Sequence, residues 1–380
     1  MGEGDGVKRV YRVLLTTTTA LAVVAGSAAA FAVPEEKKAE RGGLQEQLDG
    51  ITADSAVGAL MEVRDGDGVW RGTSGVAERG TTRAVPARGQ FRVGSVTKTF
   101  VSTVVLQLAG EGRLRLDDTV ERWLPGAVPD GHRITLRHLL NHTSGLYDFK
   151  KTLPMPPNPE FLDDRWRTWT ATEQVERAVA NPPTFEPPGL AYDYSNTGYL
   201  LLGQVIEKAT GRSYGTEIER RIIEPLRLRG TYLPGTSPGI RGPHPHGYVS
   251  IQKGGEKPEL VDYTEMNPSV FGAGGEMIST AKDLNRFVAA LLGGRLLPDR
   301  LLEAMKTPGV ETKKYGLGLA WRDTSCGIRV YGNDGDALSY QSWSFATEDQ
   351  RRQVTVALTP DFRGDTDDAV DALLDKAFCG

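Results

Sequence analysis

Segments with the pattern of β-strands lie near both ends of this chain. Apolar segments at 57–63 and 69–74 flank an Asp-Gly-Asp-Gly run, which predicts a hairpin turn. The C-terminal third has further strand-like segments at 316–321, 328–331, 338–345 and 354–358. Hairpins connect these strands, so we expect one antiparallel sheet built from both ends of the chain.

The middle of the chain is expected to be helical. Helical patterns occur at 100–108, 136–140, 173–180, 199–209, 216–223 and 281–292, with another at 367–378. We predict an α/β fold in which an antiparallel sheet is flanked by helices and carries an inserted all-helical domain. The hydrolase domain spans 44–380, with its α/β part at about 44–110 and 310–380 and its helical part at about 111–309. The cleft between two such parts is a common place for a catalytic site.

The N-terminus has the pattern of an export signal. Basic residues at 8–12 precede an apolar stretch at 13–25, and a small-x-small motif ends at Ala32. We predict a signal peptide at 1–32, a spacer at 33–43 and a secreted mature protein. The alternative is an uncleaved membrane anchor, although the apolar stretch is short for a full span.

The charge balance and the cysteine content indicate which kinds of partner and which cellular compartment to expect. The 45 basic and 49 acidic residues form no basic stripe, so nucleic acid is not an expected partner. Cys326 and Cys379 are the two cysteines, and in an exported chain they can pair. The alternative is two free buried thiols.

A Ser-x-x-Lys pattern is the main candidate for chemistry, and it occurs three times. Ser250-Lys253 has no helical pattern after it, and Ser279 precedes a helix-capping motif. Ser95 instead comes directly before an apolar helical segment. At such a helix start, Lys98 lies on the same face as Ser95 and can reach its hydroxyl.

The environment of a helix start suits a serine nucleophile. Its free N–H groups and dipole favour negative charge and disfavour the lysine cation. A buried lysine with a lowered pKa can accept a proton. We therefore predict Ser95 as the nucleophile and Lys98 as its activating partner.

A second candidate motif is Tyr194-Ser195-Asn196. In extended backbone, Tyr194 and Asn196 lie on one face and can point into the same cleft. Tyr194 could then relay protons, and Asn196 could hold Lys98 and a substrate carbonyl. A structural tyrosine is the alternative, and Tyr331-Gly332-Asn333 matches the same weak pattern.

Several motifs in order resemble one family. They are Phe91-Arg92-Val93-Gly94-Ser95-Val96-Thr97-Lys98, the run 135–146, the run 185–189 leading to Tyr194-Ser195-Asn196, and the run 272–284. Together they resemble the class C β-lactamase/D-alanyl-D-alanine carboxypeptidase family of penicillin-recognising serine enzymes. The segments 325–327 and 377–380 look like those of its secreted actinomycete carboxypeptidases.

The resemblance implies a function without metal or other cofactor. It implies an acyl-enzyme on Ser95, cleavage of acyl-D-Ala-D-Ala peptides and acylation by β-lactams. The expected partner is a small peptide or peptidoglycan stem, and the expected state is a monomer with no stable membrane span after signal cleavage.

The third motif of that family departs from the usual pattern. Asn333 stands where the family has a Lys or His, and Asp334 stands where it has a hydroxyl. These positions help to bind the substrate's carboxylate in the family, and an acidic Asp334 would repel it. Arg322 is a candidate for a compensating cation. The backbone N–H groups of Ser95 and Asp336 are the expected oxyanion hole.

Three functions therefore remain open. Activity on acyl-D-Ala-D-Ala peptides can persist through other contacts. The substrate can instead be a β-lactam, or a neutral or cationic ester or amide, as in a class C-like β-lactamase or an esterase or amidase of this fold. The third possibility is a non-catalytic protein that binds cell-wall peptide or penicillin.

Overall fold

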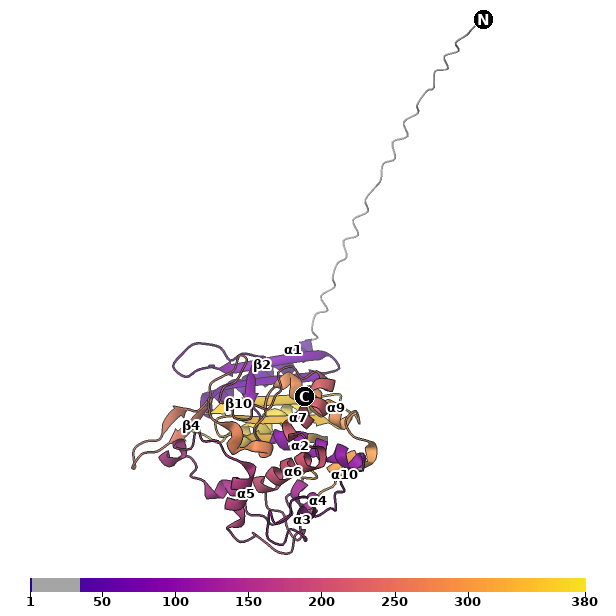
Figure 1. The fold of residues 1–380 in the computed structure, drawn as a ribbon. Helices are drawn as coiled ribbons and strands as arrows, with labels where there is room; N and C mark the ends of the chain where they lie inside the picture. The colour runs from indigo at the N-terminus through magenta and orange to yellow at the C-terminus, as the bar shows by residue number, and fades with distance from the viewer. Residues whose placement is uncertain (2–34) are drawn as a thin grey trace.

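The computed structural model describes Met1 and residues 35–380 (Figure 1). The predicted signal peptide and its cleavage site near Ala32 lie outside the described residues. Within the part that is described, no helix combines the length and the apolar character that a membrane span requires.

A six-stranded antiparallel sheet forms the centre of the molecule, in the order β2-β1-β10-β9-β8-β7. Its strands are β1 (Ala56–Asp65), β2 (Gly68–Gly75), β7 (Ala320–Asp323), β8 (Arg329–Asp336), β9 (Gln341–Thr347) and β10 (Gln353–Pro360). The first and last strands of the chain, β1 and β10, are neighbours, so the N-terminal hairpin completes a sheet that the C-terminal strands begin (Figure 1). The prediction of one sheet from both ends is confirmed.

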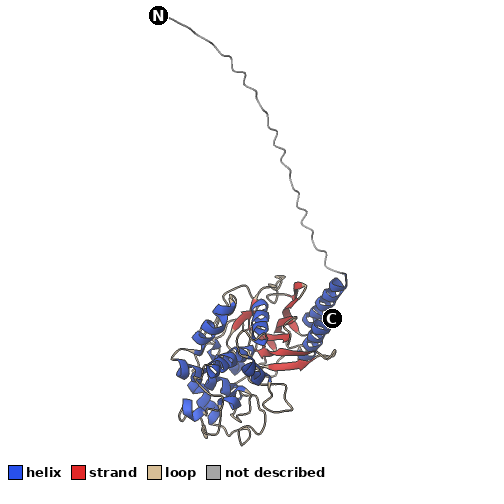
Figure 2. Cartoon of the chain, turned by 90° about the vertical axis from the view of Figure 1, so that its right-hand side faces the viewer, coloured by secondary structure: helices blue, strands red, loops and turns tan. Residues whose placement is uncertain are grey.

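Helices cover both faces of this sheet (Figure 2). On one face, α1 (Glu35–Asp54) and α11 (Asp367–Cys379) pack against a core of aliphatic and aromatic side chains from β1, β9 and β10. On the other face lie α2 (Val96–Gly110) and α9 (Ala281–Leu292). Because helices cover both faces of the sheet, β1 and β10 are buried along nearly their whole length.

The inserted part is mainly helical and lies beside one end of the sheet (Figure 1). Its helices are α3 (Val120–Trp123), α4 (Leu136–Leu140), α5 (Ala171–Val179), α6 (Asn196–Thr210), α7 (Tyr214–Ile218), α8 (Glu224–Leu226) and α10 (Asp299–Lys306). Two short strand pairs lie outside the six-stranded sheet. In the inserted part β4 (Tyr248–Ile251) pairs with β5 (Glu259–Asp262), and β6 (Ile278–Thr280) pairs with β3 (Gln90–Arg92), which precedes the insertion. The predicted α/β fold with a helical insertion is confirmed.

The predicted boundaries at about residues 111 and 309 do not separate the sheet layer from the helical part. Helix α9 belongs by sequence to the predicted helical part, yet it packs on the sheet. Its buried Asn285 donates to the Glu62 carbonyl and accepts from Thr355 Oγ1, at 3.2 and 2.8 Å. The sheet layer therefore includes a helix from the inserted segment.

Two local predictions differ from the structure. Helix α1 begins at Glu35, so most of the predicted spacer at 33–43 is helical, in keeping with its strong helix formers Glu, Lys and Ala. The segment 316–319 is a turn rather than a strand, because Gly318 has a φ of +76° and the Gly316 N–H bonds to Leu319 O.

Cys326 and Cys379 form a disulfide between the β7–β8 turn and the end of α11. The predicted pairing is confirmed. The bridge closes a loop with a sequence separation of 53 residues and ties the last helix to the edge of the sheet.

Removal of this bridge should lower stability. The double variant Cys326→Ser/Cys379→Ser is expected to lose about 4 kcal/mol of unfolding free energy, because its unfolded chain regains the entropy that the closed loop restricts. Urea denaturation measures this loss. The reduced wild-type protein is the control and should match the variant, whereas a variant as stable as the oxidised protein would contradict the prediction.

Candidate active site

Ser95 lies at the start of α2, next to the sheet. The β3–β6 pair positions the segment before it, and Gly94 turns the chain with a φ of +51°. The Ser95 side chain makes no capping bond to its own helix. Its hydroxyl instead accepts hydrogen bonds from Lys98 Nζ at 3.0 Å and from Tyr194 Oη at 2.6 Å. The structure thus brings together the three residues that the sequence assigned to chemistry.

The other two serines of this pattern have structural surroundings. Ser279 is buried in β6, where its hydroxyl pairs with Thr231 Oγ1 at 2.8 Å. Ser250 lies on β4, opposite Leu260 of β5. Neither serine precedes a helix directly, since α9 begins at Ala281 after its capping residue Thr280.

Lys98 is fully buried and has three polar partners. Its Nζ donates to Ser95 Oγ, to Asn196 Oδ1 at 2.7 Å and to the Gly274 carbonyl at 2.6 Å. Burial lowers the pKa of Lys98 to about 7, although the Asp148 carboxylate opposes this change. A large fraction of Lys98 is therefore uncharged at neutral pH.

The uncharged form of Lys98 is well arranged to act as a base. A neutral amine has two N–H groups and one lone pair. The carbonyl oxygens of Asn196 and Gly274 accept the two N–H groups, which leaves the lone pair facing Ser95 Oγ. The amine can then accept the Ser95 proton.

Tyr194 approaches Ser95 from the segment before α6. Ser195 has extended backbone angles of −136° and 119°, so Tyr194 and Asn196 reach the same cleft as predicted. Burial raises the pKa of Tyr194 well above its usual value, although its bond to Ser95 opposes this. Tyr194 is therefore a neutral phenol that donates to Ser95, and its ring packs against His142 at a tilt of 32°, with 4.1 Å between centroids.

The third motif lies at the end of β8, which continues beyond its predicted end to Asp336. Asn333 is buried and donates to Thr99 Oγ1 at 3.1 Å, so it joins β8 to α2 directly after Lys98. Asp334 is exposed in the open cleft, but the protein around it raises the pKa of its carboxyl by desolvation. The Arg322 guanidinium pairs with Asp371, and its positive charge also opposes the rise in the pKa of Asp334.

The backbone of β8 runs directly against the turn that carries Ser95. A Cβ added at Gly335 would lie 2.8 Å from Ser95 N, and one added at Gly94 would lie 2.7 Å from Asp336 N. The N–H groups of Ser95 and Asp336 therefore lie on two adjacent segments. This is the arrangement that a two-donor oxyanion hole needs.

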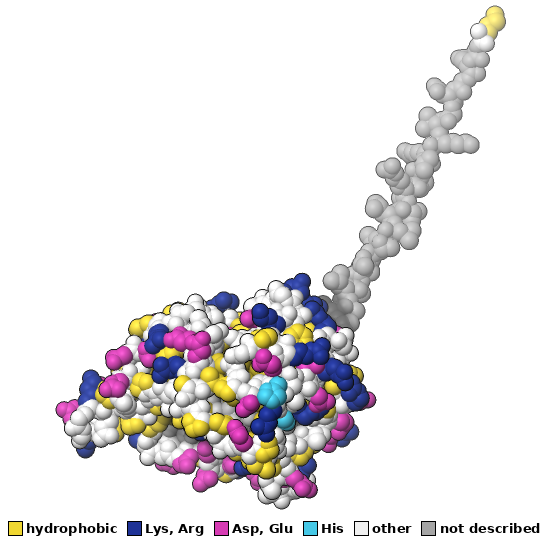
Figure 3. All heavy atoms as spheres, turned by 60° about the horizontal axis from the view of Figure 1, so that its bottom comes forward, with side chains coloured by type: hydrophobic (Ala, Val, Ile, Leu, Met, Phe, Trp, Pro, Cys, Tyr) yellow, Lys and Arg dark blue, Asp and Glu magenta, His cyan; other side chains and the backbone are white. Residues whose placement is uncertain are grey.

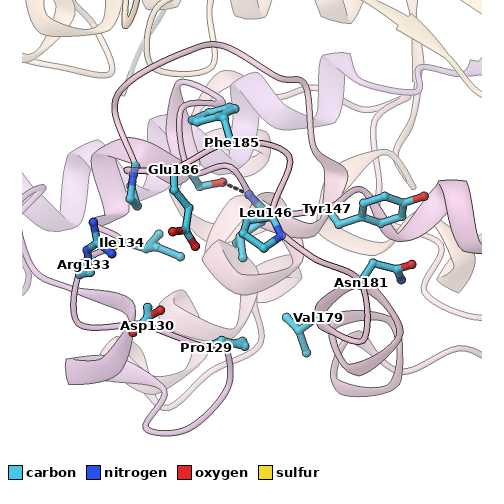
Figure 4. Close-up of a pocket in the computed structure, with 13 residues that line it drawn as sticks. Pro129, Asp130, Arg133, Ile134, Leu146, Tyr147, Val179, Asn181, Phe185 and Glu186 are labelled. Carbon is cyan, nitrogen blue, oxygen red and sulfur yellow. Dashed lines mark hydrogen bonds between the residues drawn. The ribbon is translucent and has the colours of Figure 1, made fainter.

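Ser95, Tyr194 and Asp334 line one open cleft. Its other walls include Asn196, Asn333, Asp336, Lys150, Tyr192, Phe271 and Tyr315. Figure 4 shows a different pocket, between Ile134, Leu146, Val179 and Phe185 of the helical part, which shares no lining residue with the cleft. Within residues 35–380, no group of three or more His, Cys, Asp or Glu side chains has the geometry to hold a metal. On the face in Figure 3, acidic and basic side chains are interspersed.

Sequence reasoning missed several partners of the site. Asp148 accepts from Asn196, Gly274 accepts from Lys98, and Thr99 accepts from Asn333. Lys150 adds a cation to the cleft. Their position within or beside the matched motifs was the one available signal, because none of them has a distinctive spacing of its own.

The comparison with known families decides the affiliation of this chain. The beta-lactamase family profile matches residues 44–378. The chain belongs to the beta-lactamase family. The resemblance that its motifs indicated is thereby confirmed.

Individual members of this family match the chain over most of its length. Penicillin-binding protein 4 of Amycolatopsis lactamdurans is 31% identical over 313 residues, which cover 77% of this chain and 78% of that protein. The structure of a D-stereospecific amidohydrolase from Streptomyces sp. matches with a TM-score of 0.80 and 40% identity, over 87% of this chain and 98% of that one. A D-amino acid amidase from Ochrobactrum anthropi SV3 matches with a TM-score of 0.77 and 27% identity, over 90% and 99%.

Proposed function

We propose that this protein is a serine amidohydrolase that forms an acyl-enzyme on Ser95 and cleaves amides with no carboxylate beside the scissile bond. The observation that carries this proposal is Asp334, an acidic side chain in the cleft that Ser95 and Tyr194 also line. Ser95 is hydrogen-bonded there to Tyr194 and to the buried Lys98. The similarity to amidohydrolase structures supports it.

The reaction follows from the hydrogen bonds of the site. The Lys98 lone pair takes the Ser95 proton while Ser95 Oγ attacks the amide carbonyl. The N–H groups of Ser95 and Asp336 stabilise the oxyanion. Tyr194 passes a proton to the leaving nitrogen, the C–N bond breaks, and water then releases the acid from Ser95. Since Lys98 and Tyr194 both contact Ser95 Oγ, their proton transfers are coupled.

Asp334 defines the preferred substrate charge. A carboxylate of the substrate near Asp334 would meet a like charge, whereas an ammonium would meet an opposite one. The charge of Asp334 therefore complements the free ammonium group of a D-amino-acid amide.

A second candidate is the D-alanyl-D-alanine carboxypeptidase that the sequence predicted. Lys150 favours it, because this cation lines the same cleft and could accept a substrate carboxylate. The penicillin-binding relative supports the same candidate. A carboxypeptidase of this kind should also be acylated by β-lactams.

One set of assays separates these functions. Ammonia release from D-phenylalaninamide is compared with D-Ala release from an acyl-D-Ala-D-Ala peptide, and with hydrolysis of a chromogenic cephalosporin and a short-chain ester. We expect the D-amide to have the highest kcat/KM. Faster D-Ala release would favour the carboxypeptidase, faster cephalosporin or ester hydrolysis a β-lactamase or esterase, and no turnover a binding protein.

The role of Asp334 is tested by Asp334→Asn. The variant should raise KM for D-phenylalaninamide about tenfold, because an ammonium loses its opposite charge. It should also increase D-Ala release, because the repulsion of a carboxylate disappears. Asp367→Asn, which removes a nearby charge outside the cleft lining, is the matched control and should change neither rate by more than about twofold. Equal behaviour of the two variants would refute charge recognition by Asp334.

We also propose that the protein acts outside the cytoplasm. The disulfide between Cys326 and Cys379 supports this, since such bonds persist in oxidising compartments. Fractionation of expressing cells, with the length of the mature N-terminus measured by mass spectrometry, tests both export and cleavage near Ala32.

A further inference from the structure

Asp148 is a buried carboxylate beside the cleft that the reaction above does not use. It precedes the helical turn η1 (Phe149–Thr152) and is 7% exposed. Its Oδ2 accepts from Asn196 Nδ2 at 2.9 Å, and its Oδ1 accepts from the Lys150 backbone N–H at 3.2 Å. Among the described residues, none forms an ion pair with Asp148 within 4 Å. Burial of a carboxylate without a partner of opposite charge costs free energy, unless its hydrogen bonds offset that cost.

The contact with Asn196 fixes the direction of that amide. A carboxylate only accepts hydrogen bonds, so it selects the NH₂ end of Asn196 and turns Oδ1 toward Lys98 Nζ. In the reversed direction, an N–H of Asn196 would face Lys98 and compete with the Ser95 hydroxyl for the amine's lone pair. The direction of one amide therefore decides whether Lys98 can act as a base toward Ser95.

Asp148 also contributes charge to this site. Burial is the main cause of the lowered pKa of Lys98, and Asp148 opposes it more strongly than any other group. The other charged groups that act on Lys98 are Lys150, which lowers its pKa, and Asp334, which raises it. His142 also lies near, but burial holds its pKa well below its usual value, so it is uncharged.

We infer that Asp148 is a positioning residue for the general base: through Asn196 it directs the lone pair of Lys98 at Ser95, and its negative charge acts on the same amine. This inference rests on the proposed acyl-enzyme function, because it needs Lys98 to act as the base.

The backbone around Asp148 is also held by contacts that do not involve its side chain. Thr197 Oγ1 donates to the Tyr147 carbonyl at 2.7 Å and accepts from the Phe149 N–H at 3.0 Å. Tyr147 also lines the separate pocket of the helical part that Figure 4 shows. The isosteric substitution Asp148→Asn should therefore leave the fold intact, which near-ultraviolet circular dichroism checks.

The test follows acylation of Ser95 by p-nitrophenyl acetate across the pH range, read at the isosbestic wavelength of the released nitrophenol, because the ester itself has no titrating group there. Asp148→Asn should slow acylation about tenfold at its optimum. It should also move the acidic limb of the profile to lower pH by about half a unit, because loss of the anion lowers the pKa of Lys98 further. Asp193→Asn is the matched control: this carboxylate precedes Tyr194 and has its ion pair with Lys151, so its variant should keep the wild-type rate and limb.

A double-mutant cycle separates positioning from a general structural effect. In an Asn196→Ala background, Asp148→Asn should cause no further loss of rate, while the acidic limb still moves. Additive rate losses, or a limb that stays at the wild-type pH in Asp148→Asn, would overturn the inference. A wild-type protein that no ester or amide acylates would overturn the proposed function as well, so the two failures are distinguishable.

Discussion

Replacement of Ser95 with alanine should abolish turnover and covalent labelling. We expect kcat for the best substrate to fall by about 10⁴-fold or more, because the variant has no atom that can form the acyl bond. The fold should persist, since the Ser95 side chain makes no capping bond in α2. Two measurements check this: steady-state hydrolysis of D-phenylalaninamide, and mass spectrometry of the protein after exposure to a β-lactam.

The matched control for Ser95 is another serine of the same pattern. Ser250→Ala changes the serine of the second Ser-x-x-Lys run, which lies on β4 and does not line the cleft. Its activity and its adduct should equal those of the wild type. If Ser95→Ala carried the same adduct as the wild type, the nucleophile assignment would be wrong.

Replacement of Lys98 with methionine should be nearly as damaging. Methionine fills a similar volume but has no lone pair of comparable basicity, so we expect kcat to fall by about 10³-fold. The wild-type profile for a neutral ester should lose half its activity near pH 7 on the acidic side, because protonated Lys98 has no lone pair for Ser95. The residual activity of Lys98→Met should not show this fall on the acidic side.

The sign of this pH dependence follows from the lowered pKa of Lys98. Activity requires the neutral amine, so it rises as the pH rises through about 7. Lys253→Met, in the second Ser-x-x-Lys run, is the matched control and should keep both the rate and the limb. A Lys98→Met enzyme with an unchanged limb would assign that limb to another group.

The family affiliation and the unusual third motif together explain why substrate charge is the main open question. In this chain the buried amide of Asn333 anchors β8 to α2, and Asp334 places a carboxyl in the cleft. Lys150 offers an opposite charge in the same cleft. The competition between these two charges, rather than the chemistry at Ser95, is expected to decide between an amide and a peptide with a free carboxylate.

Much of the fold could be predicted from local patterns. Helices α4 and α9 have the predicted bounds, because their apolar spacing and their capping residues, Thr135 and Thr280, act within a few neighbouring positions. The β1–β2 hairpin follows from its Asp-Gly turn in the same way. The segment at 316–319 was predicted wrongly, because two glycines formed a turn within an apolar run.

The sequence by itself determined that Ser95 begins a helix, that Lys98 lies one turn later and that Tyr194 and Asn196 share a face. These relations depend on positions at most three residues apart, where backbone geometry sets the distance. The tertiary structure alone decided how Lys98 becomes a base. Its partners Asn196 and Gly274 are 98 and 176 residues away, and Asn333 is 234 residues from Thr99. Burial and hydrogen bonding of this kind arise when distant segments pack together, so no local pattern contains them.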